Sequence, residues 1–392
     1  MRILGVIAEY NPFHNGHAHH LREARKVSGA DYVVVVISSC FTQRGEAAIL
    51  SPADRARMAL ACGADAVFAL PACWAVRDAE HFALGGVSLL HNLGCNAISF
   101  GAETADLAAL TACAHVMEQP DEAFSTALRH HMSSGLPYPA ALSAAMTECL
   151  PEAGALLASP NNTLAVCYLR AMLRLNTQME VYPIPRCADY HATDLEQPFP
   201  SATALRGAIH RGDWASLDGR IPEAALNILH AAAIEGRLLR ANALDQALLY
   251  RLRTMQDNGW GSLPDLSEGI EDRLRTAAHS AATRETLLLA DKTRRYPHAR
   301  LSRLCTHALL DMTHAQLEAE PLSTAAWLLG FRQEARPLLT QLKQNGFPII
   351  GKAADYTTDE AWFRTELLAY DLWALGCGLP AGLGFTQGVV RV

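Results

Sequence analysis

The chain has 392 residues, of which half are hydrophobic, and a formal net charge of −7 at pH 7. This length allows two or three domains, and the acidic balance argues against a protein that coats itself in nucleic acid, leaving room only for a local basic patch. No run of about 18 or more uncharged apolar residues suggests a membrane-spanning helix. MRILGVIAEYNP does not resemble a secretory signal, and ten cysteines without a CxxC pair favour free thiols in a reducing, cytoplasmic setting.

Strand and helix patterns alternate through the first half of the chain. The β-branched and apolar runs predict strands over residues 1–9, 30–38, 64–71, 95–101 and 179–185. Helical patterns lie between and after them, over residues 16–28, 52–63, 79–94, 159–175 and 201–212, with residues 104–148 also helical. Ser51 is the expected N-cap of the second of these helices, with Pro52 at its first position.

This order predicts a Rossmann-like, doubly wound α/β domain with a parallel sheet over residues 1–212. From about Asp213 the pattern changes to alanine- and leucine-rich helices with few strand signals. We therefore expect a second, mostly α-helical domain over residues 213–392. Its glycine-rich tail, GCGLPAGLGFTQGVVRV, gives no indication of where it docks.

Four histidines follow the first predicted strand, in the stretch GVIAEYNPFHNGHAHHL. Ligands of parallel α/β sheets bind outside the carboxyl ends of the strands, where the free N–H groups of a helix start also favour anions. His14 and His17 are three residues apart and share a helix face, so both imidazoles can donate to phosphate oxygens, and Gly16 leaves room for a nucleotide. Zinc is an alternative ligand, but no cysteine or further carboxylate accompanies the histidines at ligand spacing.

His14-Asn15-Gly16-His17 resembles the HxGH signature of a nucleotidyltransferase superfamily, and the longer GVIAEYNPFHNGH is similar to the opening of the bacterial tRNA(Met) cytidine acetate ligases. Further blocks resemble that family in its own order as far as residue 310: FTQRGEAAI, GADAVFALP, AEHFALGGVSLL, ISFGAE, SPNNTLAVCYL, SATALR and KTRRYPHARLSRL. The resemblance is strongest over the first 210 residues. It implies ATP as co-substrate, with Mg²⁺ on its phosphates, and acetate and elongator tRNA(Met) as the other substrates, with no obligate protein partner.

The resemblance also implies a set of functional residues. It makes His14 and His17 catalytic, and it implies ATP contacts by Ile7, Ala8, Glu9, Tyr10, Asn11, Pro12, Phe13, His14, Asn15, Gly16, His17, Ala18, His19, His20, Gly101, Asn161 or Asn162, Arg186, Cys187, Ser201, Thr203 and Arg206. Of the two asparagines, Asn162 is favoured as the ATP contact. From the residues alone, either asparagine could be a simple N-cap, Ser201 or Thr203 could cap a helix, and Arg206 offers fixed charge to phosphates. His19 and His20 are more typical of a helix surface than of a catalyst. The role of Arg44 stays open among acetate, RNA, pyrophosphate and solvent.

The densest positive stretch, KTRRYPHARLSR, contains Lys292, Arg294, Arg295, Arg300 and Arg303. Interleaved with Tyr296 and His298, which could stack on bases, it suits an RNA backbone, although a charge run is also typical of a solvated face. With the resemblance, we expect it to form part of a tRNA-binding surface.

The resemblance thus implies a ligase that forms acetyl-adenylate from acetate and ATP and transfers the acetyl group to N4 of the wobble cytidine, C34, giving N4-acetylcytidine. Two alternatives share the N-terminal motifs: an adenylyltransferase acting on a small phosphorylated acceptor, and a nucleotide-sensing tRNA-binding protein without catalytic activity. A zinc-dependent hydrolase is a weaker third. No carboxylate stands out as a metal ligand.

Overall fold

The computed structural model describes residues 1–186, 200–266, 269–291, 297–319, 322–356 and 360–392. Within these residues eight strands form one sheet, in the order β5-β4-β1-β2-β3-β6-β7, with β8 paired to β6. The strands are β1 Ile3–Ala8, β2 Tyr32–Ser38, β3 Ala66–Leu70, β4 Ala97–Ala102, β5 Glu180–Pro185, β6 Ala326–Phe331, β7 Ile349–Ile350 and β8 Val390–Arg391.

The first helices alternate with strands, as predicted, and α5 to α8 then follow one another without an intervening strand before β5. They are α1 Asn15–Ser28, α2 Pro52–Ala61, α3 Ala72–Ala75, α4 Ala79–Asn92, α5 Leu107–Glu118, α6 Glu122–Ser133, α7 Tyr138–Cys149 and α8 Pro160–Arg174. The later helices are α9 Ala202–Arg211, α10 Glu223–Ile234, α11 Asp245–Thr254, α12 Asp257–Ser262, α13 Ile270–Ser280, α14 Arg284–Asp291, α15 His298–Leu309, α16 His314–Ala319, α17 Arg336–Gln344, α18 Ala361–Cys377 and α19 Leu383–Thr386.

Strands β1 to β5 are parallel to one another, as the alternation predicts. The chain moves from β1 to β2 to β3 in one direction and then crosses back to β4 beside β1. Because such crossovers are right-handed, α1 and α2 cover one face of the sheet and α4 covers the other. The carboxyl ends of β1 and β4 therefore lie side by side, which is the switch point where ligands bind in such sheets.

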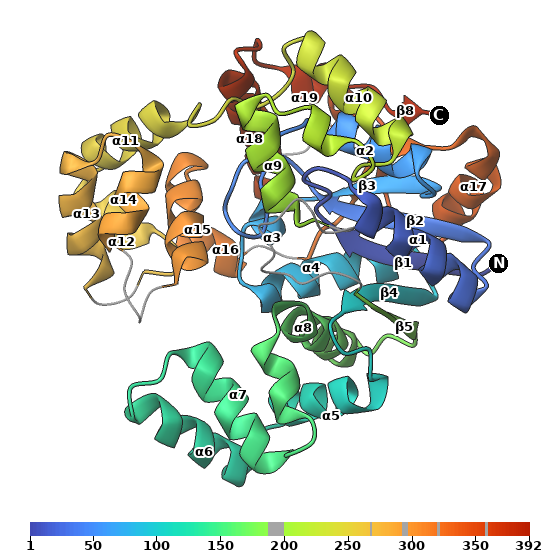
Figure 1. Ribbon diagram of the computed structural model, residues 1–392. Helices are drawn as coiled ribbons and strands as arrows, with labels where there is room; N and C mark the ends of the chain where they lie inside the picture. The colour runs from blue at the N-terminus through green and yellow to red at the C-terminus, as the bar shows by residue number, and fades with distance from the viewer. Residues whose placement is uncertain (187–199, 267–268, 292–296, 320–321, 357–359) are drawn as a thin grey trace.

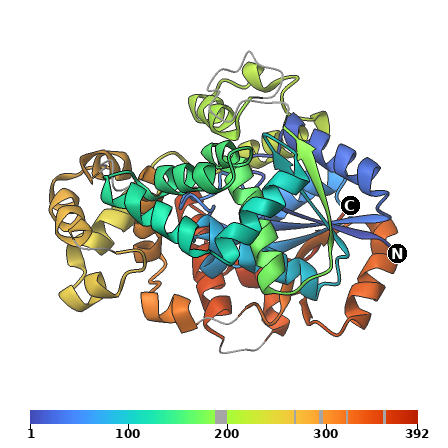
Figure 2. The same cartoon turned by 90° about the horizontal axis from the view of Figure 1, so that it is seen from below.

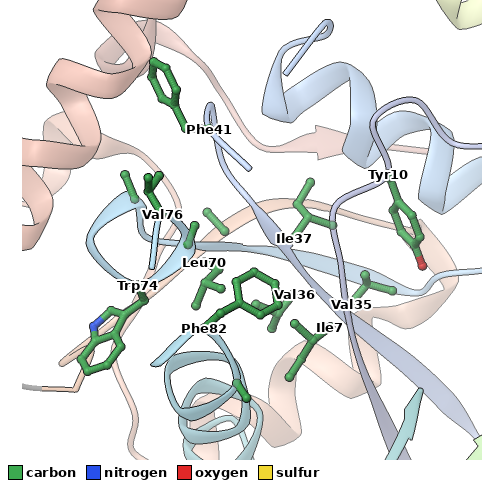
Figure 3. Packing of buried hydrophobic residues seen from close by; sticks show 14 of the residues in the cluster. Ile7, Tyr10, Val35, Val36, Ile37, Phe41, Leu70, Trp74, Val76 and Phe82 are labelled. Carbon is green, nitrogen blue, oxygen red and sulfur yellow. The ribbon is translucent and has the colours of Figure 1, made fainter. Parts of the chain in front are cut away.

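Local sequence explains these elements well. The run YVVVVIS forms β2, whose residues are almost completely buried because helices cover both faces of the sheet. Ser51 caps α2 as predicted, with its Oγ accepting from the N–H of Asp54 at 3.0 Å. Figure 3 shows the core beside the ligand edge, where Ile7, Val36 and Phe82 pack between β1, β2 and α4.

The C-terminal half is mostly helical, but it also adds β6, β7 and β8 to the sheet. Strand β6 pairs antiparallel with β3, so the complete sheet is mixed. The parallel sheet that the sequence predicted over residues 1–212 is formed by β1 to β5. The sequence AWLLGF is an uninterrupted apolar run of six residues, and periodicity alone does not distinguish a buried strand from a helix segment in so short a run. The tail docks through β8, which pairs with β6. The proposed boundary at residue 212 stays a prediction.

Helices α11 to α15 form a group on the side of the molecule away from the two chain termini, and α5 to α7 form a second group next to α8 (Figure 1). Figure 2, seen from below, again has α11 to α15 at the opposite end of the molecule from the two chain termini. Among the described residues, no helix is long and apolar enough to cross a membrane.

Candidate ATP-binding and catalytic site

The loop after β1 is tightly built. Tyr10 has a left-handed backbone with φ of 50°, an uncommon conformation for a bulky residue that is often found at functional sites. Tyr10 and Phe13 are buried, and their rings lie 4.8 and 5.5 Å from the ring of His17. The loop thus holds the His17 imidazole in place by aromatic packing.

His14 and His17 close the start of α1 reciprocally. The Nδ1 of His14 accepts from the N–H of Gly16 at 3.0 Å, and the Nδ1 of His17 accepts from the N–H of His14 at 3.3 Å. A ring nitrogen that accepts carries no proton, so the proton of each neutral ring is on Nε2. Both histidines can therefore donate from Nε2, the nitrogen that the backbone leaves unused.

Burial keeps both imidazoles neutral. Desolvation lowers the pKa of His14 to about 3, with the nearby charge of Arg186 adding to the effect. Desolvation also lowers the pKa of His17 well below its usual value, and His14, Arg186 and His20 lower it further. At neutral pH the two rings therefore act as neutral hydrogen-bond donors.

The start of α1 differs from the sequence expectation in one respect. Its backbone N–H groups are not free for an anion: Asn15 N donates to Arg220 O at 3.0 Å, and Gly16 N and His17 N donate to His14. Gly16 is required because a Cβ there would lie 2.9 Å from Cε1 of the His14 ring. Of the groups at this helix start, the imidazole side chains are therefore the ones left to serve the predicted phosphate binding.

The other two histidines of the motif have different surroundings. His20 reaches the sheet, where its Nε2 lies 3.0 Å from Oγ of Ser99. Because Ser99 Oγ donates to Tyr182 O, it accepts from His20. His19 lies towards solvent, with its Nδ1 3.0 Å from a guanidinium nitrogen of Arg22.

Glu9 follows β1 and connects the histidine loop to the hairpin after β2. Its carboxylate accepts from the N–H of Gln43 at 2.6 Å. Burial raises the pKa of Glu9, while the bond from Gln43 and the charges of Arg206 and Arg44 oppose that rise. Arg44 is exposed and belongs to this electrostatic neighbourhood, consistent with its predicted place at the ligand edge.

Strand β4 ends beside the start of α8. A Cβ on Gly101 would lie 3.3 Å from Cγ of Arg186, so the side chain of Arg186 crosses the glycine. Arg186 is also near enough to the histidines to lower their pKa values. Gly101, His14 and Arg186 are therefore brought together as the sequence predicted.

Glu103 holds the start of α8. Its carboxylate accepts from Asn161 Nδ2 at 2.6 Å and from Asn162 N at 2.9 Å. Asn162 is buried and its Oδ1 accepts from Thr104 N at 3.1 Å. Neither asparagine is the N-cap, which is Ser159, and Asn161 is the more accessible of the two. Sequence reasoning did not single out Glu103, although it ends the block ISFGAE.

Helix α9 brings a cation to the same edge. Ser201 is its N-cap, with Oγ accepting from Ala204 N at 3.2 Å, as predicted. Arg206 donates to Asn11 O at 2.9 Å and to Thr203 Oγ1 at 3.2 Å, and it forms an ion pair with Glu46 at 3.1 Å. Arg206 therefore joins α9, the histidine loop and the 41–47 hairpin.

The other predicted site residues are Cys187 and the members of the basic stretch. Cys187, Lys292, Arg294 and Arg295 lie outside the described residues. Arg300 is partly exposed and donates to Asp265 O at 2.7 Å. Arg303 is only 8% exposed and its Nε lies 3.7 Å from Asp265, a placement that favours a structural role over contact with an RNA backbone. No group of three potential metal-ligating side chains occurs in the described parts of the chain.

The whole chain resembles known proteins. The family model described as HIGH Nucleotidyl Transferase matches residues 1–378. The tRNA(Met) cytidine acetate ligase of Acetivibrio thermocellus is 32% identical over the full length of both chains, and that of Alkaliphilus metalliredigens is 34% identical over 95% of this chain and 93% of its own. This chain belongs to the tRNA(Met) cytidine acetate ligase family.

Solved structures of this family have the same fold. The apo crystal structure of Thermotoga maritima TmcAL superposes over 100% of both chains with a TM-score of 0.94 at 26% identity. A second Thermotoga maritima TmcAL structure, described as bound with alpha-thio ATP, has a TM-score of 0.91 with the same coverage and identity. The structural similarity therefore covers the C-terminal part of this chain, which contains β6 to β8, as well as its N-terminal part.

Proposed function

We propose that this protein is an ATP-dependent tRNA(Met) cytidine acetate ligase. The observation that carries the proposal is the stacked pair of neutral imidazoles, His14 and His17, at the switch point of a chain related to these ligases over its full length. ATP is the co-substrate, as the ATP-analogue complex of the Thermotoga maritima relative supports. Acetate is the proposed acid, and the cytoplasm is the proposed location.

The first step joins acetate to AMP. An acetate oxygen attacks the α-phosphorus of ATP, the bond to the β-phosphate oxygen breaks, and pyrophosphate leaves. Acetate is already an anion at neutral pH and needs no general base. Catalysis therefore requires positioning and stabilisation of negative charge at phosphorus, which the Nε2–H groups of His14 and His17 supply together with Arg206.

The second step transfers the acetyl group to RNA. The N4 amine of cytidine C34 in elongator tRNA(Met) attacks the acetyl carbon, AMP leaves with the electron pair, and the amine loses one proton to give N4-acetylcytidine. Magnesium is expected to accompany the phosphates. The nearby carboxylates of Glu9 and Glu46 are engaged by Gln43 and Arg206.

The adenosine end of ATP is proposed to lie along Gly101, Asn161 and Arg186. Gly101 presents backbone at the end of β4, and Arg186 and Asn161 lie on either side of Glu103, which accepts from Asn161 and is near the guanidinium of Arg186. For tRNA, we propose the surface at the beginning of α15, with Arg300 as its described member.

The deciding experiment follows pyrophosphate release from ATP by the purified protein, with and without acetate, and then the entry of labelled acetate into bulk bacterial tRNA. Acetate-dependent release followed by labelled tRNA is the expected result. Release that does not depend on acetate would contradict the proposal and favour an adenylyltransferase with another acceptor. ATP binding without any product would favour a nucleotide-sensing protein.

A further inference from the structure

A second site of polar character lies beside the proposed ATP site. A cavity of about 340 Å³ is enclosed by the beginning of α4, the loop after α12, and helices α15 and α16. Its volume is at the lower end of the ~300–1,000 Å³ range of small-molecule pockets. Leu263, Pro264 and Leu317 supply apolar wall, which suits a flat ring, and polar groups occupy the remainder.

His307 on α15 is one of the residues that line this cavity, and one of its ring nitrogens has no hydrogen-bond partner. It is 1% exposed, and its Nε2 lies 2.6 Å from the carbonyl oxygen of Val76, an atom that can only accept. The neutral ring therefore carries its proton on Nε2, and Nδ1 is an acceptor. That Nδ1 is buried and has no hydrogen-bond partner. Buried polar atoms are rarely left in this state in the absence of a ligand or water.

The other polar groups of the cavity include three carboxylates, those of Asp78, Asp265 and Glu318, and two further histidines, His81 and His314. The carboxylate of Asp78 already accepts from the backbone N–H and Nδ1 of His81 at 2.9 Å, so Asp265 and Glu318 supply the remaining carboxylate acceptors. The one arginine in the lining, Arg77, donates to the carbonyl oxygen of Leu317 at 3.1 Å and lies over the ring of Trp74, so its charge is directed into the protein. A ligand that complements this lining presents N–H donors.

The cavity touches both proposed substrate regions. Gln43 donates from its side chain to Arg77 O at 2.9 Å, and its own N–H donates to Glu9 in the histidine loop at 2.6 Å. On the other side, Arg300 donates to the carbonyl oxygen of Asp265. Asp265 has φ of 60°, an uncommon conformation that Arg300 and Arg303 hold in place. The residues that line the cavity therefore connect the histidine loop, where ATP is proposed to bind, with the beginning of α15, where tRNA is proposed to bind.

We infer that this cavity binds an RNA base that carries an exocyclic amine, with the amine donating to Nδ1 of His307. The inference rests on the proposed function and adds a base-binding subsite to it. A cytosine or adenine ring has a flat face that can pack against the apolar side chains, and its exocyclic amine can donate hydrogen bonds to the acceptors of the cavity. The site holds the RNA; it is not where the acetyl group is transferred.

The test uses the full-length protein and hairpin RNAs of the anticodon arm in which one loop base at a time is replaced by an analogue lacking its exocyclic amine. At one position, wild-type protein should bind the analogue about tenfold more weakly, the scale of one lost buried hydrogen bond. His307→Phe should bind the unmodified RNA about tenfold more weakly and show no further loss with that analogue. His307→Gln, which can both donate and accept, should recover part of the affinity.

Two matched variants control for folding and for surface effects. His279→Phe alters an exposed histidine on α13, outside the cavity, and should leave RNA affinity unchanged. Glu318→Gln removes an exposed carboxylate at the cavity rim and should weaken binding a few-fold, so it provides the test if His307→Phe does not fold.

Three results would overturn the inference. One is unchanged RNA affinity in both His307→Phe and Glu318→Gln. Another is a loss of RNA affinity that is the same for the amine-free analogue at every loop position, in both wild type and His307→Phe. The third is His307-dependent binding of free cytidine or adenosine monophosphate without any effect on RNA, which would assign the cavity to free nucleotides. Acetate-dependent pyrophosphate release, measured in parallel, reports on the proposed function separately, because the cavity variants should retain it.

Discussion

The imidazole rings of His14 and His17 are stacked, with centroids 3.7 Å apart and planes inclined by 26°. Each ring accepts a backbone N–H through Nδ1, so each is also part of the helix start. One geometry thus does two things: it caps α1 and it aims two Nε2–H donors away from the helix. Loss of either ring should affect both folding and catalysis, and the two effects can be separated.

Two substitutions at His14 separate the effect on folding from the effect on catalysis. Asparagine is a good N-cap, so His14→Asn should keep the start of α1 while removing the Nε2–H donor. His14→Ala should lose both the cap and the donor. We expect both variants to slow acetate-dependent pyrophosphate release by roughly 10²-fold or more, the scale of one lost preorganised donor, with only His14→Ala showing a lowered Tm, by an amount matching about 1 kcal/mol. Unchanged turnover in His14→Asn would remove the assigned role.

Stability should fall with acidity because of the same pair. The pKa of His14 is lowered to about 3 in the folded protein, and that of His17 is also lowered. A histidine whose folded pKa lies below its unfolded value of ~6.5 binds more protons when unfolded. Its contribution is therefore complete above pH 6.5 and is lost as the pH falls towards 3, by on the order of 2 kcal/mol for His14 at pH 5.

Urea unfolding at pH 7.5 and pH 5 measures this loss, and His14→Asn should show a smaller one than wild type. The rate of the first step should show no inflection near pH 6.5, since neither ring titrates there when folded. An inflection at that pH, absent from His14→Asn, would show that His14 is charged below it.

For Glu366, which lies outside the histidine loop, we expect the opposite pH dependence of the free energy of unfolding. This residue is 1% exposed, its carboxylate accepts from Ala72 N at 2.7 Å, and burial raises its pKa to about 7. A carboxyl group whose folded pKa is raised stabilises the fold below its unfolded pKa, and that contribution is lost as the pH rises through 7. Glu366→Gln should therefore raise the free energy of unfolding at pH 9 relative to wild type, by about 3 kcal/mol, with a much smaller gain at pH 5. A gain of equal size at both pH values would contradict the raised pKa.

Gly45 anchors the hairpin after β2 to α15. Its φ is 73°, and a Cβ there would lie 2.6 Å from backbone atoms of Arg303, which cannot move aside as a side chain can. Gly135 has a similar positive φ of 91° with no atom near its missing Cβ. Gly135→Ala should cost about 1 kcal/mol from backbone strain alone, whereas Gly45→Ala should cost several-fold more. Equal losses of stability in thermal unfolding would show that the hairpin and α15 separate easily.

Local patterns in the sequence were sufficient for much of the N-terminal half. The β-branched run of β2, the Ser51 cap and the spacing of His14 and His17 each depend on residues within a few positions of one another. Such short-range signals determine whether a strand or helix forms and which residues share its face. They also located the ligand edge, because the carboxyl ends of parallel strands meet there.

The tertiary structure decided what depends on residues far apart in the chain. Strand β6 pairs antiparallel with β3, which lies about 260 positions earlier in the chain. Glu103 accepts a hydrogen bond from the backbone N–H of Asn162 at the start of α8. The carbonyl oxygen of Arg220 accepts from the N–H of Asn15, which would otherwise be open to an anion. The unpartnered nitrogen of His307 likewise depends on Val76 and on the loop around Asp265. Each is a contact between elements, set by packing and hydrogen-bond satisfaction across the fold, and periodicity along the chain carries no record of it.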